Sequence, residues 1–444
     1  MRINPGNKTP RIVTAEEAAG VVKSGDWLDY GSVLVQPDLF DHALAARKLE
    51  LRDIKIRSCI SVRPRAVLEA DPDGEHFFWF SWHFGGYDRA KHDAKIAHYI
   101  PVNLGEIPDY YTRFNDPIDV AILKARSADE NGNYNFGGSQ LWHRTVVERA
   151  RIVIVEINDR LPHVFGAQNS IHHGEIDYII EGNDLGNAEL PSAPPSAVDQ
   201  AVGRLIAAEI ENGSCLQIGI GGMPNAVCSV LLQSDARDLG IHTEMLTDGI
   251  IDLYKSGRVT GANKKIDVGK TVFTFSLGSK ILYETIDRNP HFHCCPVEYT
   301  NMPQNIMRND RVVAINNTTQ IDLQGQAASE SDGHRHISGT GGQLQFVRAA
   351  YASENGKAFI CLASTYERHG IRRSRIVLNL TPGNIVTTPR SDMMYVVTEY
   401  GIVNLKGKSV AERAKALISI AHPDYRENLE REAREHRLIP KGYH

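Results

Sequence analysis

Glu244 is a carboxylate residue whose place in the sequence suits a chemical role. It lies in residues 241–249 (IHTEMLTDG), one helix and one strand beyond Gly219. In a parallel sheet, that interval puts Glu244 near the same sheet edge as Gly219. A carboxylate there can act as a nucleophile or as a general base. Most glutamates are instead surface or ion-pair residues, and by position alone Glu156 and Glu399 are comparable candidates.

Two glycine-rich loops supply backbone N–H groups. Residues 219–225 (GIGGMPN) follow a strand-like run and open a helical pattern with Pro224 in its first turn. Residues 338–346 (SGTGGQLQF) also lead into a helical pattern. Free N–H groups at a helix start can hold a phosphate or stabilise an oxyanion. The alternatives are a tight turn without a ligand for the first loop and a flexible loop for the second. The first loop is not a dinucleotide fingerprint, because Pro224 replaces its third glycine.

Residues of metal-binding type occur without the spacing of a known zinc site. They are His172, His173, His291, His293, Cys294, Cys295, His334 and His336. Neighbouring cysteines on a strand point to opposite faces, so we expect no metal site. The sequence also contains no serine nucleophile elbow and no P-loop.

An aromatic segment, residues 77–87 (FFWFSWHFGGY), allows two interpretations. It can pack in the core, or it can form the apolar wall of a pocket for a small acyl group. We expect a mixture of the two, with residues 82–87 nearer a site.

The elements that position these residues belong to an α/β pattern. Short, continuously apolar runs favour buried parallel strands over residues 27–30, 119–124, 151–158, 215–220, 271–277, 312–316, 358–362 and 395–398. Helical patterns fall between them, over residues 15–23, 198–211, 225–233, 410–420 and 425–436. Thr14 with Glu17 forms a capping-box pattern, and Ser409 and Asp424 are expected N-caps. Alternating strands and helices predict open parallel sheets.

Residues 190–196 (LPSAPPS) are typical of an extended linker between two domains. We therefore predict one α/β domain over residues 1–190 and a second over residues 200–444. A ligand site is expected between the domains or at the carboxyl ends of strands.

The amino-acid composition limits the classes of function that this chain can have. The chain has 444 residues, 42% hydrophobic and 23% charged, as in ordinary globular proteins. Its net charge is -5 and its densest basic stretch is residues 372–375 (RRSR), which disfavours nucleic-acid binding.

The six cysteines lack disulfide-like spacing and are expected as buried thiols in a reducing cytosol. Residues 1–6 contain no signal core, and no apolar stretch approaches the roughly 20 residues that cross a bilayer, so we expect a cytoplasmic protein without a membrane partner.

Six segments together resemble the acetyl-CoA hydrolase/transferase family, closest to its 4-hydroxybutyrate and butyryl-CoA:acetate CoA-transferases. They are residues 129–137 (DENGNYNFG), 219–227 (GIGGMPNAV), 241–249 (IHTEMLTDG), 338–346 (SGTGGQLQF), 397–407 (VTEYGIVNLKG) and 420–425 (IAHPDY). Their order and spacing agree over nearly the whole chain. The resemblance implies two α/β domains with open, mostly parallel sheets of the NagB/RpiA-like type.

The resemblance also implies a set of site residues. Glu244 is the catalytic carboxylate, and Ile220 and Gly342 are backbone donors of an oxyanion hole. The expected coenzyme contacts are Gly219, Ile220, Gly221, Gly222, Met223, Gly339, Gly341, Gly342, Gln343 and Lys357. The expected substrate contacts are Asn301, Gly31, Trp82 and Phe84. Gln345 stands where the family pattern has Asp. By composition, Arg372, Arg373, Arg375 and Arg390 join Lys357 as candidates for holding the CoA phosphates.

The implied reaction is transfer of CoA between small acids through acyl-glutamyl anhydride and glutamyl-CoA intermediates on Glu244. Coenzyme A is then a substrate and a covalent thioester, and no tightly bound cofactor is expected. A carboxylate with a reference pKa near about 4.3 needs no base at pH 7. The alternatives are an acyl-CoA hydrolase on the same scaffold, an inactive CoA- or nucleotide-binding protein, and a sugar-phosphate isomerase. The acyl group is not readable from the sequence, and a homo-oligomer is expected on general grounds.

Overall fold

A computed structural model describes residues 8–182, 185–190 and 194–443. The chain divides into two compact units, Met1–Leu190 with Val272–Thr300, and Pro191–Thr271 with Asn301–His444. The division after Leu190 coincides with the predicted linker, whose residues 191–193 lie outside the described part, as do residues 1–6. A single cut does not describe the chain, however, because residues 272–300 group with the first unit. There the Thr274 carbonyl accepts hydrogen bonds from the N–H groups of Gln140 and Leu141.

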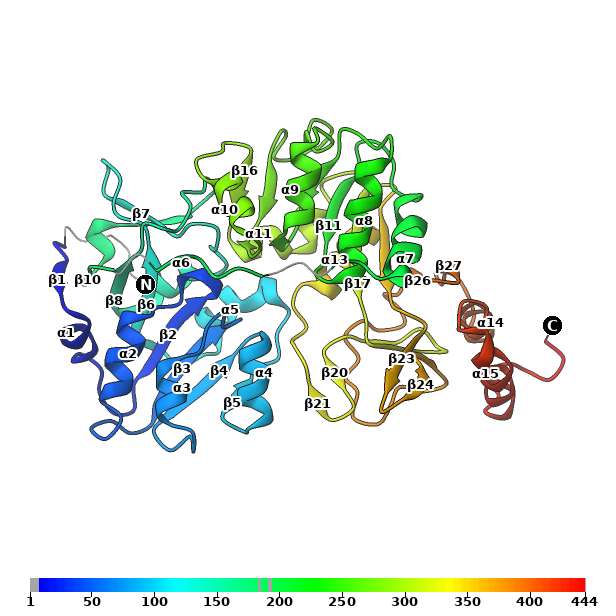
Figure 1. The fold of residues 1–444 in the computed structure, drawn as a ribbon, viewed down its shortest axis with the longest axis horizontal. Helices are drawn as coiled ribbons and strands as arrows, with labels where there is room; N and C mark the ends of the chain where they lie inside the picture. The colour runs from blue at the N-terminus through cyan, green and yellow to red at the C-terminus, as the bar shows by residue number, and fades with distance from the viewer. Residues whose placement is uncertain (1–7, 183–184, 191–193, 444) are drawn as a thin grey trace. The chain divides into compact units, whose positions relative to one another are not determined.

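The first unit is built on one eight-stranded sheet in which every neighbouring pair is parallel. Its spatial order is β1 (Arg11–Val13), β10 (Tyr178–Ile180), β8 (Ala150–Ile157), β6 (Ile118–Ala125), β2 (Trp27–Ser32), β3 (Ile54–Cys59), β4 (Phe77–Ser81) and β5 (Ala97–Tyr99). The helices are α1 (Ala15–Ala19), α2 (Leu39–Ala46), α3 (Ala66–Ala70), α4 (Gly86–Asp93), α5 (Ile107–Arg113), α6 (His143–Arg149) and α10 (Lys280–Ile286), with short 3-10 turns η1 (Val33–Val35), η2 (Leu104–Glu106) and η3 (His173–Glu175). Figure 1 shows β2, β3 and β4 as the blue strands of this sheet.

The second unit contains a run of six neighbouring strands from an eight-stranded sheet, and this run is parallel except at one edge. Its order is β12 (Gly240–His242), β11 (Cys215–Ile218), β17 (Val312–Asn317), β22 (Lys357–Cys361), β26 (Tyr395–Thr398) and β27 (Gly401–Asn404), of which β27 is antiparallel. The helices are α7 (Ala197–Ala207), α8 (Gly222–Gln233), α9 (Asp248–Lys255), α12 (Pro303–Ile306), α13 (Gln343–Ala352), α14 (Val410–Ser419) and α15 (Pro423–Glu435). The α7 and α8 helices pack side by side (Figure 1). The predicted α/β fold with mostly parallel sheets is therefore confirmed.

The remaining strands are short. In the first unit β7 (Asn133–Asn135) pairs with β9 (Ser170–His172), and β14 (Thr271–Phe273), β15 (Phe275–Ser276) and β16 (Phe292–Cys294) follow later in the chain. In the second unit they are β13 (Met245–Leu246), β18 (Gln320–Asp322), β19 (Ala327–Ala328), β20 (Ser331–Asp332), β21 (Arg335–His336), β23 (Thr365–Arg368), β24 (Ile371–Ser374) and β25 (Ile376–Val377). The α11 helix (Val297–Asn301) ends where the chain returns to the second unit.

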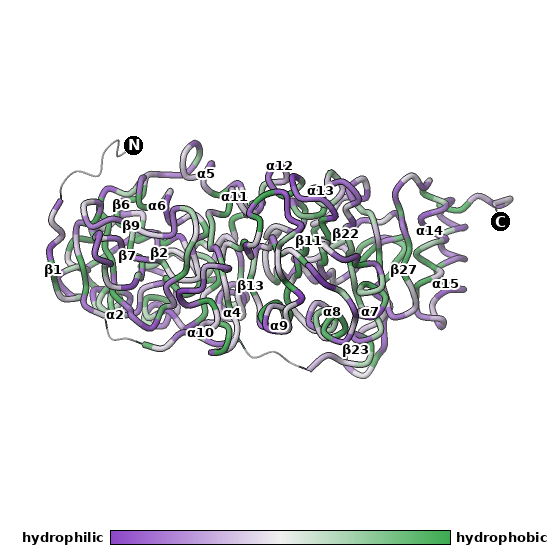
Figure 2. The backbone as a smooth tube through the Cα atoms, turned by 90° about the horizontal axis from the view of Figure 1, so that it is seen from above, coloured by the Kyte–Doolittle hydropathy of each residue, from purple (hydrophilic) through white to green (hydrophobic). Residues whose placement is uncertain are grey.

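Two of the three predicted N-caps are confirmed. The capping boxes of Thr14 with Glu17 and of Ser409 with Glu412 are both formed. The prediction that Asp424 caps α15 is wrong: His422 is the N-cap, because Pro423 takes the first helical position, where its missing N–H costs nothing. Hydrophobic and hydrophilic residues are interspersed along α14 and α15, as Figure 2 shows, and Leu417 and Leu429 are on the buried faces.

Other predicted elements differ from the structure at their ends. The strand predicted over residues 271–277 is interrupted at Thr274, and the first helix stops at Ala19. All six cysteines are buried, as expected, and none is joined in a disulfide. In the described part of the chain, no helix is long and apolar enough to cross a membrane.

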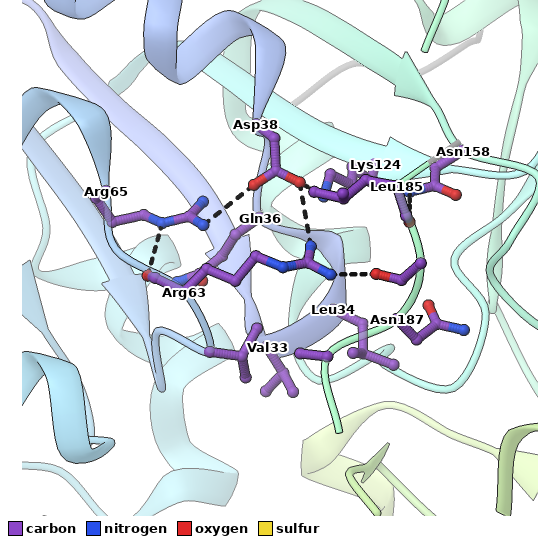
Figure 3. Close-up of a pocket in the computed structure, with 13 residues that line it drawn as sticks. Val33, Leu34, Gln36, Asp38, Arg63, Arg65, Lys124, Asn158, Leu185 and Asn187 are labelled. Carbon is purple, nitrogen blue, oxygen red and sulfur yellow. Dashed lines mark hydrogen bonds and ion pairs between the residues drawn. The ribbon is translucent and has the colours of Figure 1, made fainter. Parts of the chain in front are cut away.

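A buried ionic cluster lies at the carboxyl end of β6. Asp38, in the turn before α2, contacts the Lys124 ammonium and the guanidinium groups of Arg63 and Arg65, the latter at 3.3 and 3.1 Å (Figure 3). Although burial opposes ionisation, Lys124 and Arg65 hold the pKa of Asp38 below its ordinary value. The cluster sits between β2 and β6, where the strand order of the sheet reverses, and it ties the two halves of the sheet together.

We predict that Asp38→Asn destabilises the first unit by about 3 kcal/mol, because it leaves buried cations without their counter-ion. The measurement is urea unfolding followed by tryptophan fluorescence, since all four tryptophans, Trp27, Trp79, Trp82 and Trp142, lie in the first unit. Asp53→Asn is the matched control: it breaks an exposed ion pair with Lys55 and is expected to cost less than about 1 kcal/mol. Equal stability losses in the two variants would contradict the structural role of the cluster.

Candidate active site

The first glycine loop lies at the switch point of the second sheet. From β11 the chain moves to β12 on one side, whereas β17, β22 and β26 follow on the other. The loop leaves β11 after Ile218, and α8 begins at Gly222. The crevice at such a reversal, beyond the carboxyl ends of the strands, is where open α/β sheets bind ligands.

Two positions of this loop require glycine, one because of its backbone conformation and one because there is no room for a side chain. Gly221 has a φ of 115°, in the region that side chains avoid. A Cβ on Gly222 would lie 2.5 Å from Oδ2 of Asp199, which caps α7 together with Ser196. Asn317, at the end of β17, donates from Nδ2 to the Ile220 carbonyl at 3.0 Å. The loop is thus bonded to β17 and lies close against α7, with the Ile220 side chain exposed and Met223 turned inward in the first turn of α8.

Glu244 lies at the same edge of the sheet. The register pairs Cys215 with Gly240 and Leu216 with Ile241, so the chain beyond β12 reaches Glu244 next to the position of Gly219. The sequence placed these two residues at one edge by counting elements, and the register supports that placement.

Two donors hold the half-buried Glu244 carboxylate. Asn301, the last residue of α11, donates from Nδ2 to Oε2 at 2.6 Å, and the backbone N–H of Gly342 donates to the same carboxylate. Burial raises the pKa of Glu244 to about 7, although both hydrogen bonds oppose this shift by favouring the charged form. A carboxyl group with its pKa near neutrality at the ligand-binding edge of a sheet has the electrostatics of a functional residue.

The second glycine loop supplies one of these donors at its end. Gly341 has a φ of 57°, and Gly342 is the N-cap of α13. A Cβ on Gly342 would lie 2.5 Å from both Glu244 Oε2 and Asn301 Nδ2. Only glycine therefore allows the backbone to approach the carboxylate this closely.

Asn301 contributes a second feature to the site. Its side chain is fully buried, and its Oδ1 has no hydrogen-bond partner within the described residues. Because a buried acceptor without a donor is costly, this oxygen is available to a donor on a bound substrate.

The competing carboxylates have structural partners. Glu156 accepts hydrogen bonds from the N–H groups of Asp38, Leu39 and Phe40 and so caps the start of α2. Glu399 accepts from the N–H and the hydroxyl of Ser364 at 2.9 and 2.6 Å. Glu244 differs from both in that its carboxylate accepts a hydrogen bond from the N–H of a glycine loop.

The expected phosphate-binding cations do not gather at the site. The expected coenzyme contact of Lys357 is corrected by its position. Lys357 begins β22 at the amino edge of the sheet, opposite Glu244, and its ammonium contacts Glu209 at 3.0 Å. The other basic candidates are engaged or peripheral: Arg372 pairs with Asp424, Arg375 donates to the Thr319 carbonyl, Arg390 contacts Gln324, and Arg373 lies on the exposed β24. Composition could not reveal these positions because it carries no information about sheet edges.

The expected substrate contacts Gly31, Trp82 and Phe84 all belong to the first unit. Gly31 has a φ of 60°, and a Cβ there would lie 2.6 Å from Leu123. Trp82 and Phe84 are buried; the Trp82 indole donates to the Tyr111 hydroxyl at 3.3 Å, and Phe84 packs against Tyr99. The aromatic segment thus contributes to the core of its unit.

Other sequence features have no site character. In the described part of the chain, no three side chains of His, Cys, Asp or Glu are grouped so as to hold a metal ion. Gln345, which replaces the expected Asp, is buried in α13 and donates to the Met302 sulfur at 3.4 Å. One contributor to the first glycine loop, Asn317, was missed by the sequence interpretation. Its only signal was weak, that of a polar residue ending an apolar strand.

Comparison with known proteins identifies the family of this chain. A family model described as the acetyl-CoA hydrolase/transferase N-terminal domain matches residues 7–191, and one for the C-terminal domain matches residues 278–433. A butyryl-CoA:acetate CoA-transferase from Anaerostipes caccae is 44% identical over 95% of this chain and 96% of its own length. A probable butyrate:acetyl-CoA coenzyme A-transferase from Syntrophomonas wolfei is 46% identical over 97% of each chain.

Solved structures agree with this relationship. The crystal structure of RipA from Yersinia pestis is similar with a TM-score of 0.88 and 34% identity, over 97% of this chain and 98% of that one. Both halves of the chain and nearly its full length are therefore matched. The chain belongs to the acetyl-CoA hydrolase/transferase family and stands among its CoA-transferases.

Proposed function

We propose that this protein transfers CoA between a short-chain acyl-CoA and a free carboxylate such as acetate, through covalent intermediates on Glu244. The observation that carries the proposal is the Glu244 carboxylate, held by Asn301 and by the Gly342 N–H at the carboxyl edge of the sheet. The names of the two similar transferases support butyryl and acetyl groups as the first acyl groups to test.

The proposed reaction proceeds by alternate attack on two carbonyl groups. Ionised Glu244 attacks the thioester carbonyl of the acyl-CoA, and the C–S bond breaks. CoA departs as the thiolate, and an acyl-glutamyl anhydride remains on the protein. The thiolate then attacks the glutamyl carbonyl of the anhydride, which releases the free acid and leaves glutamyl-CoA. A second carboxylate attacks the glutamyl-CoA and reverses the sequence, so that the new acyl-CoA forms and Glu244 is regenerated.

The donors around Glu244 suit the charge that develops in these steps. Each attack turns a carbonyl oxygen into an oxyanion, which needs preorganised N–H donors. Gly342 and Asn301 already direct N–H groups at the Glu244 carboxylate, and the glycine loop after β11 presents further backbone at the same edge. Removing one such donor typically slows a reaction by about 10²–10³.

The ionisation of Glu244 differs from the expectation for an ordinary glutamate. With a pKa of about 7, only about half of the free protein carries the nucleophilic carboxylate at neutral pH. The ionised fraction needs no general base, and its partial desolvation makes it a stronger nucleophile than a hydrated carboxylate.

The covalent intermediate is the first prediction. Mixing the protein with acetyl-CoA or butyryl-CoA is expected to give a CoA adduct by intact-protein mass, and borohydride reduction is expected to mark residue 244. Glu244→Gln should form none, because an amide is not a nucleophile. Glu209→Gln, which alters a carboxylate at the opposite edge of the sheet, should form the adduct normally. A folded wild-type protein that forms no adduct with either substrate would exclude the glutamyl mechanism.

A second prediction concerns the close approach of Gly342. Gly342→Ala is expected to lower kcat by about 10² or more, because the added methyl group displaces the donor from the Glu244 carboxylate. Steady-state transfer from butyryl-CoA to acetate measures the effect. Gly86→Ala is the control, since a Cβ there meets nothing within 4 Å at the start of α4. If Gly342→Ala retained wild-type activity, the N–H of residue 342 would have no role in the reaction.

A third prediction follows from the pKa of Glu244. Because the protonated acid is not nucleophilic, kcat/KM for the acyl-CoA is expected to rise about tenfold from pH 6 to pH 8, with a midpoint near 7. Rapid-quench measurement of free-acid release and glutamyl-CoA formation, without an acceptor acid, isolates this half-reaction. A rate that is constant across this range would show that Glu244 is already fully ionised at pH 6.

A further inference from the structure

The second glycine loop is held by a buried carboxylate that lies outside it. Thr340 donates from Oγ1 to Oε2 of Glu330 at 2.9 Å. Glu330 lies between β19 and β20 and is only 3% exposed. Its other carboxylate oxygen accepts from the Thr387 hydroxyl at 3.2 Å. Thr340 is thereby tied to a fixed, buried anchor.

A second clamp holds the other side of the same turn. Gln343 donates from Nε2 to the hydroxyls of Ser329 and Thr388, both at 2.9 Å. Ser329 directly precedes Glu330, so residues on both sides of Gly341 and Gly342 are fastened to one short stretch of chain. The turn between the clamps contains the left-handed Gly341 and ends at the donor Gly342.

The position of this turn matters because Gly342 contacts the Glu244 carboxylate. Its N–H donates to the Glu244 carboxylate, and there is no room beside it even for a methyl group. A donor contributes to catalysis only when it is held within a fraction of an ångström of its productive position. Without the clamps, the glycines would leave the turn free to move, because glycine backbone has wide conformational freedom.

We propose that Glu330 is a positioning residue for the transfer reaction: through Thr340 it holds the Gly341–Gly342 turn so that the Gly342 N–H stays directed at Glu244. The inference rests on the proposed function for its catalytic consequence. In this proposal Glu330 holds Thr340, Thr340 holds the turn that ends at Gly342, and Gly342 directs its N–H at the reacting carboxylate.

The test compares variants at position 340. Thr340→Val removes the hydroxyl with little change of shape and is expected to lower kcat about tenfold with KM for the acyl-CoA little changed, less than full loss of a donor. Thr340→Ser keeps the hydroxyl and is expected to stay within about twofold of wild type. Thr260→Val is the matched control, because it also removes a hydroxyl–carboxylate bond, to Asp238 at 3.2 Å, beside the amino end of β12.

A second readout distinguishes positioning from a general loss of stability. The Gly342 hydrogen bond lowers the pKa of Glu244 against the effect of burial. A loosened turn therefore raises that pKa further, in Thr340→Val and in Glu330→Gln, but not in Thr260→Val. The protonation of Glu244 can be followed by the pH dependence of carbodiimide labelling at residue 244, read by peptide mass, without any transferase activity.

The outcomes separate this inference from the proposed function. Wild-type kcat together with a wild-type labelling profile in Thr340→Val overturns the inference, and Glu330→Gln provides an independent second variant. Equal effects in Thr260→Val and Thr340→Val would also overturn it, because the role would then be structural only. If wild type itself transfers no CoA, the proposed function fails, whereas the labelling profiles still decide whether Glu330 controls the environment of Glu244.

Discussion

The interaction on which the site depends is the pair of N–H donors held against the half-buried Glu244 carboxylate. Burial alone raises the pKa of Glu244, and the hydrogen bonds from Asn301 and Gly342 limit that rise to about 7. The balance keeps the group poised between acid and carboxylate at neutral pH. The same donors that stabilise the charged form are placed where the proposed reaction would need donors for its oxyanions.

The surrounding fold explains how these donors are kept in place. Parallel strands bring the ends of β11, β12 and β17 to one edge, and the reversal of strand order opens that edge to a ligand. The glycines then permit backbone to approach where side chains would collide, most clearly at Gly342. Glycine also gives the loop backbone conformational freedom, which side-chain hydrogen bonds restrict. Asn317 bonds to the first loop, and bonds of Glu330 and Gln343 fix the second.

The two units use buried charge differently. In the first, Asp38 is surrounded by Lys124, Arg63 and Arg65, so its charge is fully compensated and serves the fold. In the second, Glu244 is held by neutral amide donors, which support its charge only in part. A carboxylate with neutral partners can change its protonation state and react, whereas one enclosed by cations is kept ionised.

The sequence by itself determined the fold class and the main strands and helices, and it indicated the two glycine loops and Glu244 as candidate site residues. Apolar runs and capping residues such as Thr14 and Ser409 act locally, and the motif around Glu244 is distinctive enough to identify the family. The tertiary structure decided what depends on long-range contacts. Lys357 and Glu244 look equally plausible along the chain, yet they lie at opposite edges of one sheet. The return of residues 272–300 to the first unit, the capping role of Glu156 and the clamp on Thr340 have the same origin, because each joins residues that are distant in sequence and adjacent only after folding.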